Sequence, residues 1–90
     1  MELTKTNENF NLTDTTEQGW TLNGNASKDT EGNIYINGIV NSELGEPVGN
    51  IYYHKPAEGH MNLNLEVSET NRDVFSAYAD SVIDFVLSQF

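Results

Sequence analysis

The sequence contains no cysteine and only four basic residues, and it has no long apolar run. Without cysteine the chain can form neither a disulfide framework nor a thiolate zinc site, and it has no cysteine nucleophile. A membrane-spanning helix needs a run of about 18 apolar residues, which is missing. The polar start of the chain is unlike the apolar core of a signal peptide, so we predict a cytoplasmic protein.

Basic residues are too few and too scattered for a nucleic-acid site. Four Lys and Arg stand against 14 Asp and Glu, which gives a formal net charge of −10. Phosphate binding needs clustered cations, so we expect the chain to bind neither nucleic acid nor a membrane surface directly. A strongly acidic surface instead favours a basic protein as the partner. The four cations are Lys5, Lys28, Lys55 and Arg72.

The length and the apolar content predict one small domain preceded by an arm. The chain has 90 residues and 37% of them are hydrophobic, which is enough for one core. Residues 1–19 contain few large apolar side chains, so we predict a loose polar arm there and a single α+β domain over residues 20–90. Phe10 and Leu12 are two positions apart and share one face of an extended segment, so they are the residues through which the arm would dock.

Residues 20–67 alternate apolar and polar side chains, which is typical of an antiparallel meander. We predict four strands, over residues 20–26, 33–40, 48–54 and 60–67. Asn23-Gly24 and Asn37-Gly38 are dipeptides favoured in tight hairpin turns. We nevertheless place both inside strands, where a glycine marks a bulge or a close approach of two backbones.

The strand register follows from placing the apolar residues on one face of the sheet. This pairing puts Val48 on the outer face, away from the core. The predicted partners are Leu22 with Gly38, Ala26 with Ile34, Ile36 with Ile51, Ile51 with Leu63, and His54 with His60.

The last segment changes to a helical period. Thr70-Asn71-Arg72-Asp73 matches the capping-box pattern ahead of an apolar run. The apolar positions from Val74 to Phe90 cover about half of the helix circumference, which is more than one face of a small sheet requires. Deep burial in the protein's own core is the simpler interpretation, and the alternative is that the arm or a partner covers part of this stripe. The predicted fold is α+β: a four-stranded antiparallel β-meander with one C-terminal amphipathic helix on one face, which forms a two-layer open sandwich.

The two histidines are the only residues that invite a catalytic or metal interpretation. His54 and His60 would face each other across a hairpin, with Glu58 nearby, but a zinc site needs more ligands than this pattern supplies. General acid–base catalysis needs a cleft that perturbs a pKa, and no catalytic motif is present. We therefore predict a protein without enzymatic activity, catalytic residues, metal or cofactor.

The acidic residues form the first candidate binding surface. In a meander, alternate loops and the start of the helix lie at one end of the sheet, which gathers carboxylates there. Near the end of the helix, carboxylates oppose the helix dipole and no basic residue offsets them. The candidate residues are Glu17, Glu43, Glu46, Glu66, Glu69, Asp73, Asp80 and Asp84.

The uncovered face of the sheet forms the second candidate surface. Tyrosines within a frame of uncharged polar residues resemble the composition of a protein–protein interface. An outer face kept polar for solvation is the simpler interpretation. The candidate residues are Tyr35, Asn37, Ile39, Asn50, Tyr52 and Asn62.

Two functions fit these surfaces. The first is a small inhibitor or accessory protein that uses its carboxylates as a nucleic-acid mimic and binds a basic partner such as a nuclease. Phages and mobile elements encode inhibitors of this size and charge, although no motif of such a family occurs here. The second is a homodimeric structural or carrier subunit that associates through its Tyr/Asn sheet face, with the acids serving only solubility.

Overall fold

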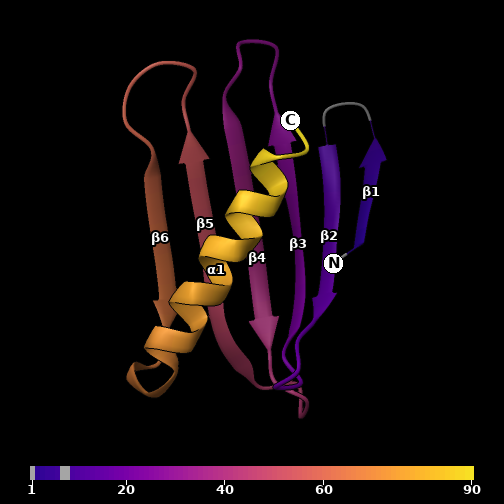
Figure 1. Cartoon of the computed structure of the whole chain (residues 1–90), viewed down its shortest axis with the longest axis vertical. Helices are drawn as coiled ribbons and strands as arrows, with labels where there is room; N and C mark the ends of the chain where they lie inside the picture. Colours follow the sequence, from indigo (N-terminus) through magenta and orange to yellow (C-terminus); the bar gives the residue numbers. More distant parts are fainter. Residues whose placement is uncertain (1, 7–8) are drawn as a thin grey trace.

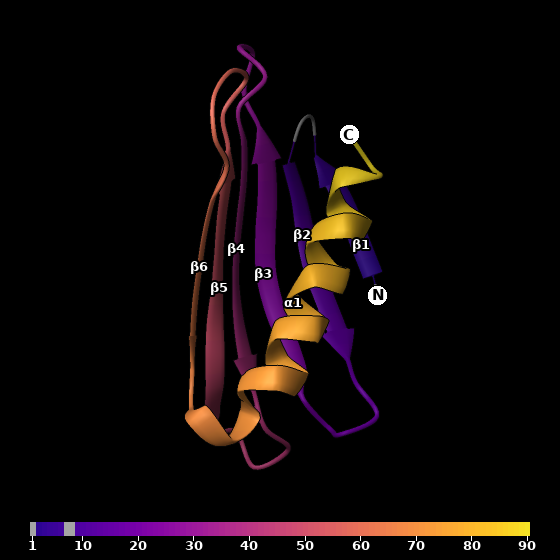
Figure 2. The same ribbon diagram turned by 60° about the vertical axis from the view of Figure 1, so that its left-hand side comes forward.

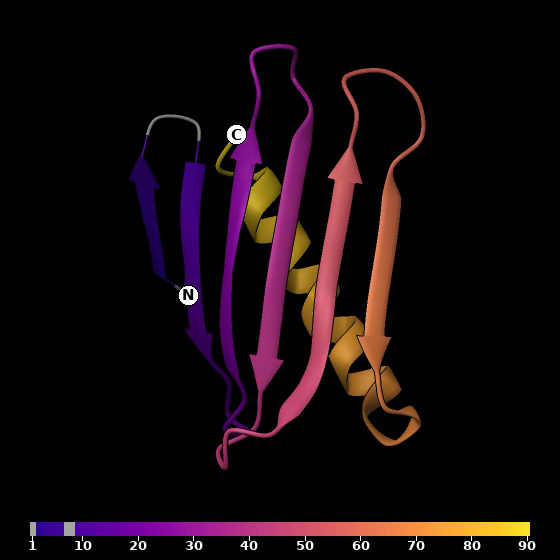
Figure 3. The ribbon, with the colours of Figure 1, turned by 180° about the vertical axis from the view of Figure 1, so that it is seen from behind.

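The computed structural model describes residues 2–6 and 9–90, which form one antiparallel sheet and one C-terminal helix. The α+β class is confirmed, but the predicted number of four strands is wrong because the sheet has six. Helix α1 crosses one face of the sheet diagonally (Figure 1), and the view from behind shows the other face uncovered (Figure 3). The elements are β1 (Glu2–Thr6), β2 (Asn9–Thr15), β3 (Thr21–Lys28), β4 (Ile34–Asn41), β5 (Pro47–Lys55), β6 (Asn62–Val67), the 3-10 turn η1 (Glu69–Asn71) and α1 (Arg72–Leu87).

The N-terminal segment is not a loose arm, because it supplies the two additional strands. β2 pairs with β3 along its whole length, and β1 pairs with β2. Phe10 and Leu12 are 4% and 1% exposed, so the predicted docking residues are confirmed. The ring of Phe10 meets the ring of Phe90 edge-on at 4.9 Å. Two buried side chains suffice for β2 because β1 and β3 both pair with its backbone and Phe90, which follows α1, packs on Phe10.

The other four strands lie where the sequence predicted them, to within two residues at each end. Gly24 and Gly38 sit opposite each other inside β3 and β4 rather than in turns. A Cβ at Gly24 would overlap the carbonyl oxygen of Asn37. The predicted close approach of two backbones at these Asn-Gly dipeptides is therefore confirmed.

The predicted register is wrong by two residues in each of the three hairpins. A shift of two leaves every side chain on its predicted face, so alternation alone could not detect the error. The observed partners are Leu22 with Val40, Ala26 with Ile36, Ile36 with Tyr53, Ile51 with Leu65, and His54 with Asn62.

The β3–β4 turn shows the origin of the shift, because its centre lies one residue further along the chain than predicted. The backbone N–H of Asp29 donates to the carbonyl of Asn33 at 3.0 Å, so residues 30–32 lie between the closing pair. The predicted pairing of Ala26 with Ile34 places residues 29–31 there instead. Gly32 has φ +96°, a backbone conformation that favours glycine. The β2–β3 and β4–β5 turns repeat this arrangement with Thr16 and Gly19, and with Ser42 and Gly45.

Val48 lies in the core, not on the outer face as predicted. The register of β4 against β5 shifts between Val40 and Asn41, so Val48 is an extra residue in β5. Such a bulge changes the alternation of a strand locally. Val48 is consequently 8% exposed and packs with the other buried residues.

The helix packs its apolar side on the inner face of the sheet. Phe75, Ala79 and Val86 are fully buried, and the ring of Phe75 lies 6.1 Å from the ring of Trp20. The predicted capping box does not form, because Asn71 makes no side-chain cap and Thr70 lies within η1. The backbone N–H of Asn71 donates instead to the carbonyl of Ser68 at 3.1 Å. The side view in Figure 2 shows the resulting two layers.

Candidate functional site

Carboxylates from three parts of the chain meet at one end of the sheet. The β2–β3 turn, the β4–β5 turn and the β6–α1 junction all lie there (Figures 1 and 2). The side chain of Glu43 occupies the space beside Gly19, so the two turns touch. Within residues 9–90, Arg72 is the basic residue at this end, and its Nε lies 3.5 Å from Oδ1 of Asp73. We call the following residues the acidic end: Glu17, Glu43, Glu46, Glu69 and Asp73.

The other three predicted acids lie elsewhere. Glu66 is on the outer sheet face, where its carboxylate accepts a hydrogen bond from Asn50 Nδ2 at 3.3 Å. Asp80 and Asp84 are on α1 and border a hollow toward the opposite end of the sheet. The eight acids therefore form three separate groups, and Asp80 and Asp84 lie away from the acidic end, as their place near the end of the helix predicts.

The hollow beside Asp80 and Asp84 has a volume of about 350 Å³ and lies between α1 and the β5–β6 hairpin. The ring of Tyr53 and the side chain of Ile83 form an apolar floor, and these residues are 3% and 7% exposed. Burial and the Asp84 carboxylate both raise the pKa of Tyr53, which places that charge close to the floor. We call this hollow the β6 groove; it is lined by Tyr53, Met61, Leu63, Asp80, Ile83, Asp84 and Leu87.

The sequence identified the two carboxylates of the β6 groove but missed its apolar lining. The predicted pairing of His54 with His60 implies that Met61 lies opposite Tyr53 on the inner face, whereas Met61 precedes β6 and is 56% exposed. The diagonal path of α1 leaves this corner of the inner face open (Figure 1). The one sequence signal for the β6 groove is Met61, an apolar residue that lies just before β6 and two positions from Leu63.

The outer sheet face carries almost no charge. Between β2 and β6, its outward positions hold a single charged residue, Glu66. Ile39 and Tyr52 are 54% and 39% exposed on this face, and an open hollow forms beside them. One continuous row across five strands consists of Asn11, Asn25, Asn37, Tyr52 and Asn64.

The two histidines do not face each other. The ring of His54 stacks on the ring of Tyr35, with centroids 4.5 Å apart and planes at 5°. His54 pairs with Asn62, and His60 lies in the β5–β6 loop. The Nε2 atom of His54 is buried without a hydrogen-bond partner. Within residues 2–6 and 9–90, no three side chains of the types that bind metals converge.

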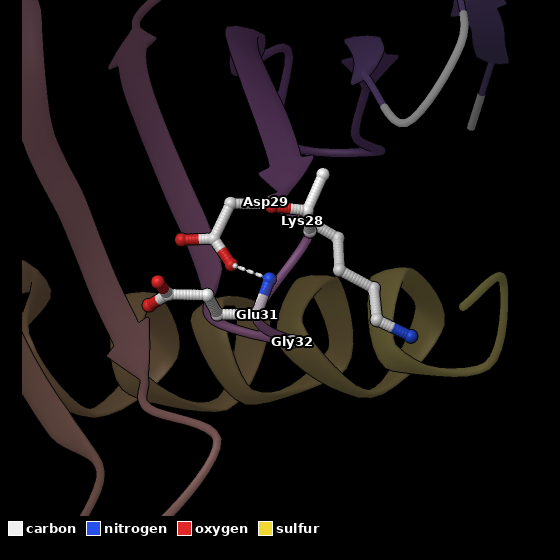
Figure 4. A pocket seen from close by; sticks show the side chains of 5 residues that line it. Lys28, Asp29, Glu31 and Gly32 are labelled. Carbon is white, nitrogen blue, oxygen red and sulfur yellow. Dashed lines mark hydrogen bonds between the residues drawn. The ribbon is translucent and has the colours of Figure 1, made fainter.

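Asp29 is committed to the structure of its turn. Its carboxylate accepts from the backbone N–H of Glu31 at 2.9 Å (Figure 4). It also accepts from the backbone N–H of Asn33 at 2.9 Å and from the side-chain amide of Asn33 at 2.8 Å. These hydrogen bonds, that of the Asn33 side chain above all, lower the pKa of Asp29. Asn33 also accepts from the backbone N–H of Ala57 at 2.9 Å, which ties this turn to the next hairpin.

A partly buried hydrogen bond joins the helix to β2. The hydroxyl of Tyr78 donates to Oδ2 of Asp14 at 2.7 Å, and its ring lies edge-on to Trp20 at 6.4 Å. Burial, followed by this hydrogen bond, raises the pKa of Tyr78. The neutral phenol is thus the form that the folded state prefers.

The raised pKa of Tyr78 predicts a loss of stability in alkali. Because the folded state disfavours the phenolate, the stabilisation is fully present below the ordinary tyrosine pKa of about 10 and is lost as the pH rises above it. We expect urea midpoints to fall between about pH 9.5 and 11.5. Tyr78→Phe should reduce this decline, and the remainder belongs to Tyr53, whose pKa is also raised. Equal declines in both proteins would exclude Tyr78 as the cause.

Comparison with protein-family models, with curated proteins and with solved structures gives no match to this chain. Over residues 2–6 and 9–90, no helix has the length and apolar content needed to cross a membrane. The functional argument therefore depends on the surfaces themselves.

Proposed function

We propose that the protein is a non-enzymatic interaction module that binds a basic partner protein through its carboxylates. It would act as a small inhibitor or accessory protein that mimics nucleic acid toward a partner such as a nuclease. The observation that supports this most is the charge distribution. Three separate segments bring five carboxylates to the acidic end, whereas the outward positions of β2 to β6 hold one.

The carboxylates on α1 add a second argument. Asp84 lies in the last turn of the helix, where no basic residue accompanies it. Negative charge at a helix C-terminus opposes the helix dipole and costs about 0.3–1 kcal/mol. A role in binding would explain why the sequence keeps a residue that lowers stability in this way.

Competition for basic proteins tests this proposal. The chain is immobilised and exposed to a heparin-binding protein fraction at about 50 mM salt, then eluted with duplex DNA or with about 500 mM salt. We expect retained proteins that both treatments release. The chain should no longer retain basic proteins when the acidic end is reversed, in the triple variant Glu43→Lys/Glu46→Lys/Glu69→Lys. The same loss is expected for the double variant Asp80→Lys/Asp84→Lys on α1. The double variant Tyr35→Ala/Tyr52→Ala on the outer sheet face should retain them. Retention that survives both charge reversals and high salt would refute the proposal.

Asp84 also provides a test that needs no partner. We expect Asp84→Asn to raise the free energy of unfolding by about 0.3–1 kcal/mol, because it removes a charge that opposes the helix dipole. Asp73→Asn is the matched control: Asp73 lies in the first turn, where negative charge is favourable, so its removal should lower stability. Urea denaturation measures both. Destabilisation by Asp84→Asn would remove this argument for a binding role.

The outer sheet face favours a second function, a homodimeric structural or carrier subunit. In a chain of net charge −10, this face is the surface where two copies repel least. The molecule measures about 39 by 27 Å in its two longest dimensions, which is comparable with the roughly 800 Å² per partner of a stable interface. Tyr52 and Ile39 would then form the centre of the contact.

A further inference from the structure

The sheet ends in an unguarded edge strand. The order of strands places β6 at one edge, so the outer side of its backbone has no strand partner among the described residues. Natural proteins protect such edges with lysine, proline or bulges. β6 (Asn62–Val67) contains neither residue type, and its pairing with β5 is regular. Its free N–H and C=O groups can therefore accept another strand.

The β6 groove lies directly beside this edge. Leu63 belongs to β6 and lines the groove, and Met61 is the residue just before the strand. A strand added to β6 would project alternate side chains toward the inner face of the sheet, next to Met61 and Leu63. These side chains would therefore enter the groove.

The chemistry of the groove selects the side chains that fit. Its floor is apolar, whereas Asp80 and Asp84 on α1 border it. Lysine and arginine combine an apolar stem with a charged head, so the stem can pack on Met61 while the head reaches a carboxylate. A second copy of the chain fits less well, because β6 itself contains no basic residue.

We propose that β6 binds an extended segment of the basic partner, in which lysine or arginine occupies every second position. The segment adds to the sheet as a further strand, and its basic side chains enter the β6 groove and pair with Asp80 and Asp84. This inference rests on the proposed function and deepens it, since it adds a second contact with the same partner, separate from the acidic end, and names the conformation of the segment that makes it.

Two peptides of equal composition separate this site from general charge attraction. The probe is a fluorescein-labelled seven-residue peptide that alternates threonine and arginine, and the control holds its three arginines in one block. Fluorescence anisotropy at about 50 mM salt measures binding of each to the full chain. We expect the alternating peptide to bind about tenfold more tightly, a difference of about 1.4 kcal/mol.

Variants then locate the site. Asp80→Asn/Asp84→Asn should weaken the alternating peptide about tenfold, whereas Glu43→Gln/Glu46→Gln at the acidic end should change it less than twofold. Met61→Ser tests the apolar contact and should weaken binding severalfold, because Met61 is exposed and its replacement leaves the core intact. Unfolding curves check that each variant is folded.

Methylated peptides test strand addition itself. Methyl groups on alternate backbone nitrogens block one edge of a strand, so of the two methylated series one should lose binding and the other keep it. Equal binding of the alternating and block peptides, or equal loss in the two methylated series, would refute the β6 site. If the acidic-end variant then weakens binding, the proposed function stands. If neither peptide binds, both proposals fail.

Discussion

Replacing Phe75 with alanine is expected to lower the free energy of unfolding by about 3–5 kcal/mol. Phe75 is fully buried where α1 crosses the sheet, and its ring packs near Trp20 at 6.1 Å. The ring also fills the space beside Gly49, where a Cβ would lie 2.9 Å from it. A chain of 90 residues has a total stability of about 5–13 kcal/mol. This one substitution therefore removes between about a quarter of the total stability and all of it.

Val74→Ala is the matched control for this prediction. Val74 is the preceding residue in the same helix, but its side chain is 50% exposed. Its truncation should cost less than about 1 kcal/mol. Trp20 is the single tryptophan and contacts Phe75, so its fluorescence reports on the site, and circular dichroism gives an independent curve. Equal losses for the two variants would show that α1 does not pack as described.

Gly24→Ala is expected to destabilise the sheet by about 3 kcal/mol or to prevent folding. A Cβ at Gly24 would overlap the carbonyl oxygen of Asn37 and would lie 2.8 Å from the Cα of Gly38. These are backbone atoms of β4, so relief of the overlap requires the strands to separate. Alanine at this position thus breaks the pairing of β3 with β4, on which the acidic end also depends.

Gly38→Ala offers the closest comparison, because Gly38 pairs with Gly24. Its Cβ would lie 2.9 Å from Cδ1 of Leu22, the far end of a flexible side chain that can rotate away. Alanine also costs less backbone entropy than glycine. The change should therefore stay within about 1 kcal/mol. The account of the β3–β4 contact is wrong if Gly38→Ala proves the more damaging of the two in urea denaturation.

The sequence predicted four of the six strands, the helix and, apart from Val48, the buried faces of these elements, but not the register. Alternation fixes pairing only to a multiple of two residues, so Ile36 opposite Ile51 and Ile36 opposite Tyr53 bury the same side chains. The turns decide between them. Thr16, Asp29 and Ser42 each precede a glycine of positive φ by three residues, and this shared pattern gives the loop length. The bulge at Val48 has no such signal.

The N-terminal strands β1 and β2 cannot be predicted from residues 1–19 alone, because these residues contain too few apolar side chains to form strands without the rest of the chain. Phe10 and Leu12 are too few to order 19 residues by themselves. The backbone of β3 and the ring of Phe90, from the other end of the chain, supply what the segment lacks. Contacts this distant in sequence leave no local pattern.

The candidate surfaces were predictable to different degrees. The acidic end follows from the topology, because alternate turns of any meander lie together, and Glu17 and Glu43 are placed as expected. The β6 groove depends on the path of α1 across the sheet. No residue pattern sets that angle, so Met61 and Leu63 emerged only from the structure.

We propose that the protein acts on a partner through its carboxylates and not on a second copy of itself. The most direct measurement is the solution molecular mass by light scattering at about 50 and 500 mM salt, which bracket weak and strong screening. The account predicts the mass of one chain, 10.0 kDa, at both salt concentrations. A mass of about twice that value at both, independent of salt, would contradict it and identify the Tyr35–Tyr52 face as a dimer interface.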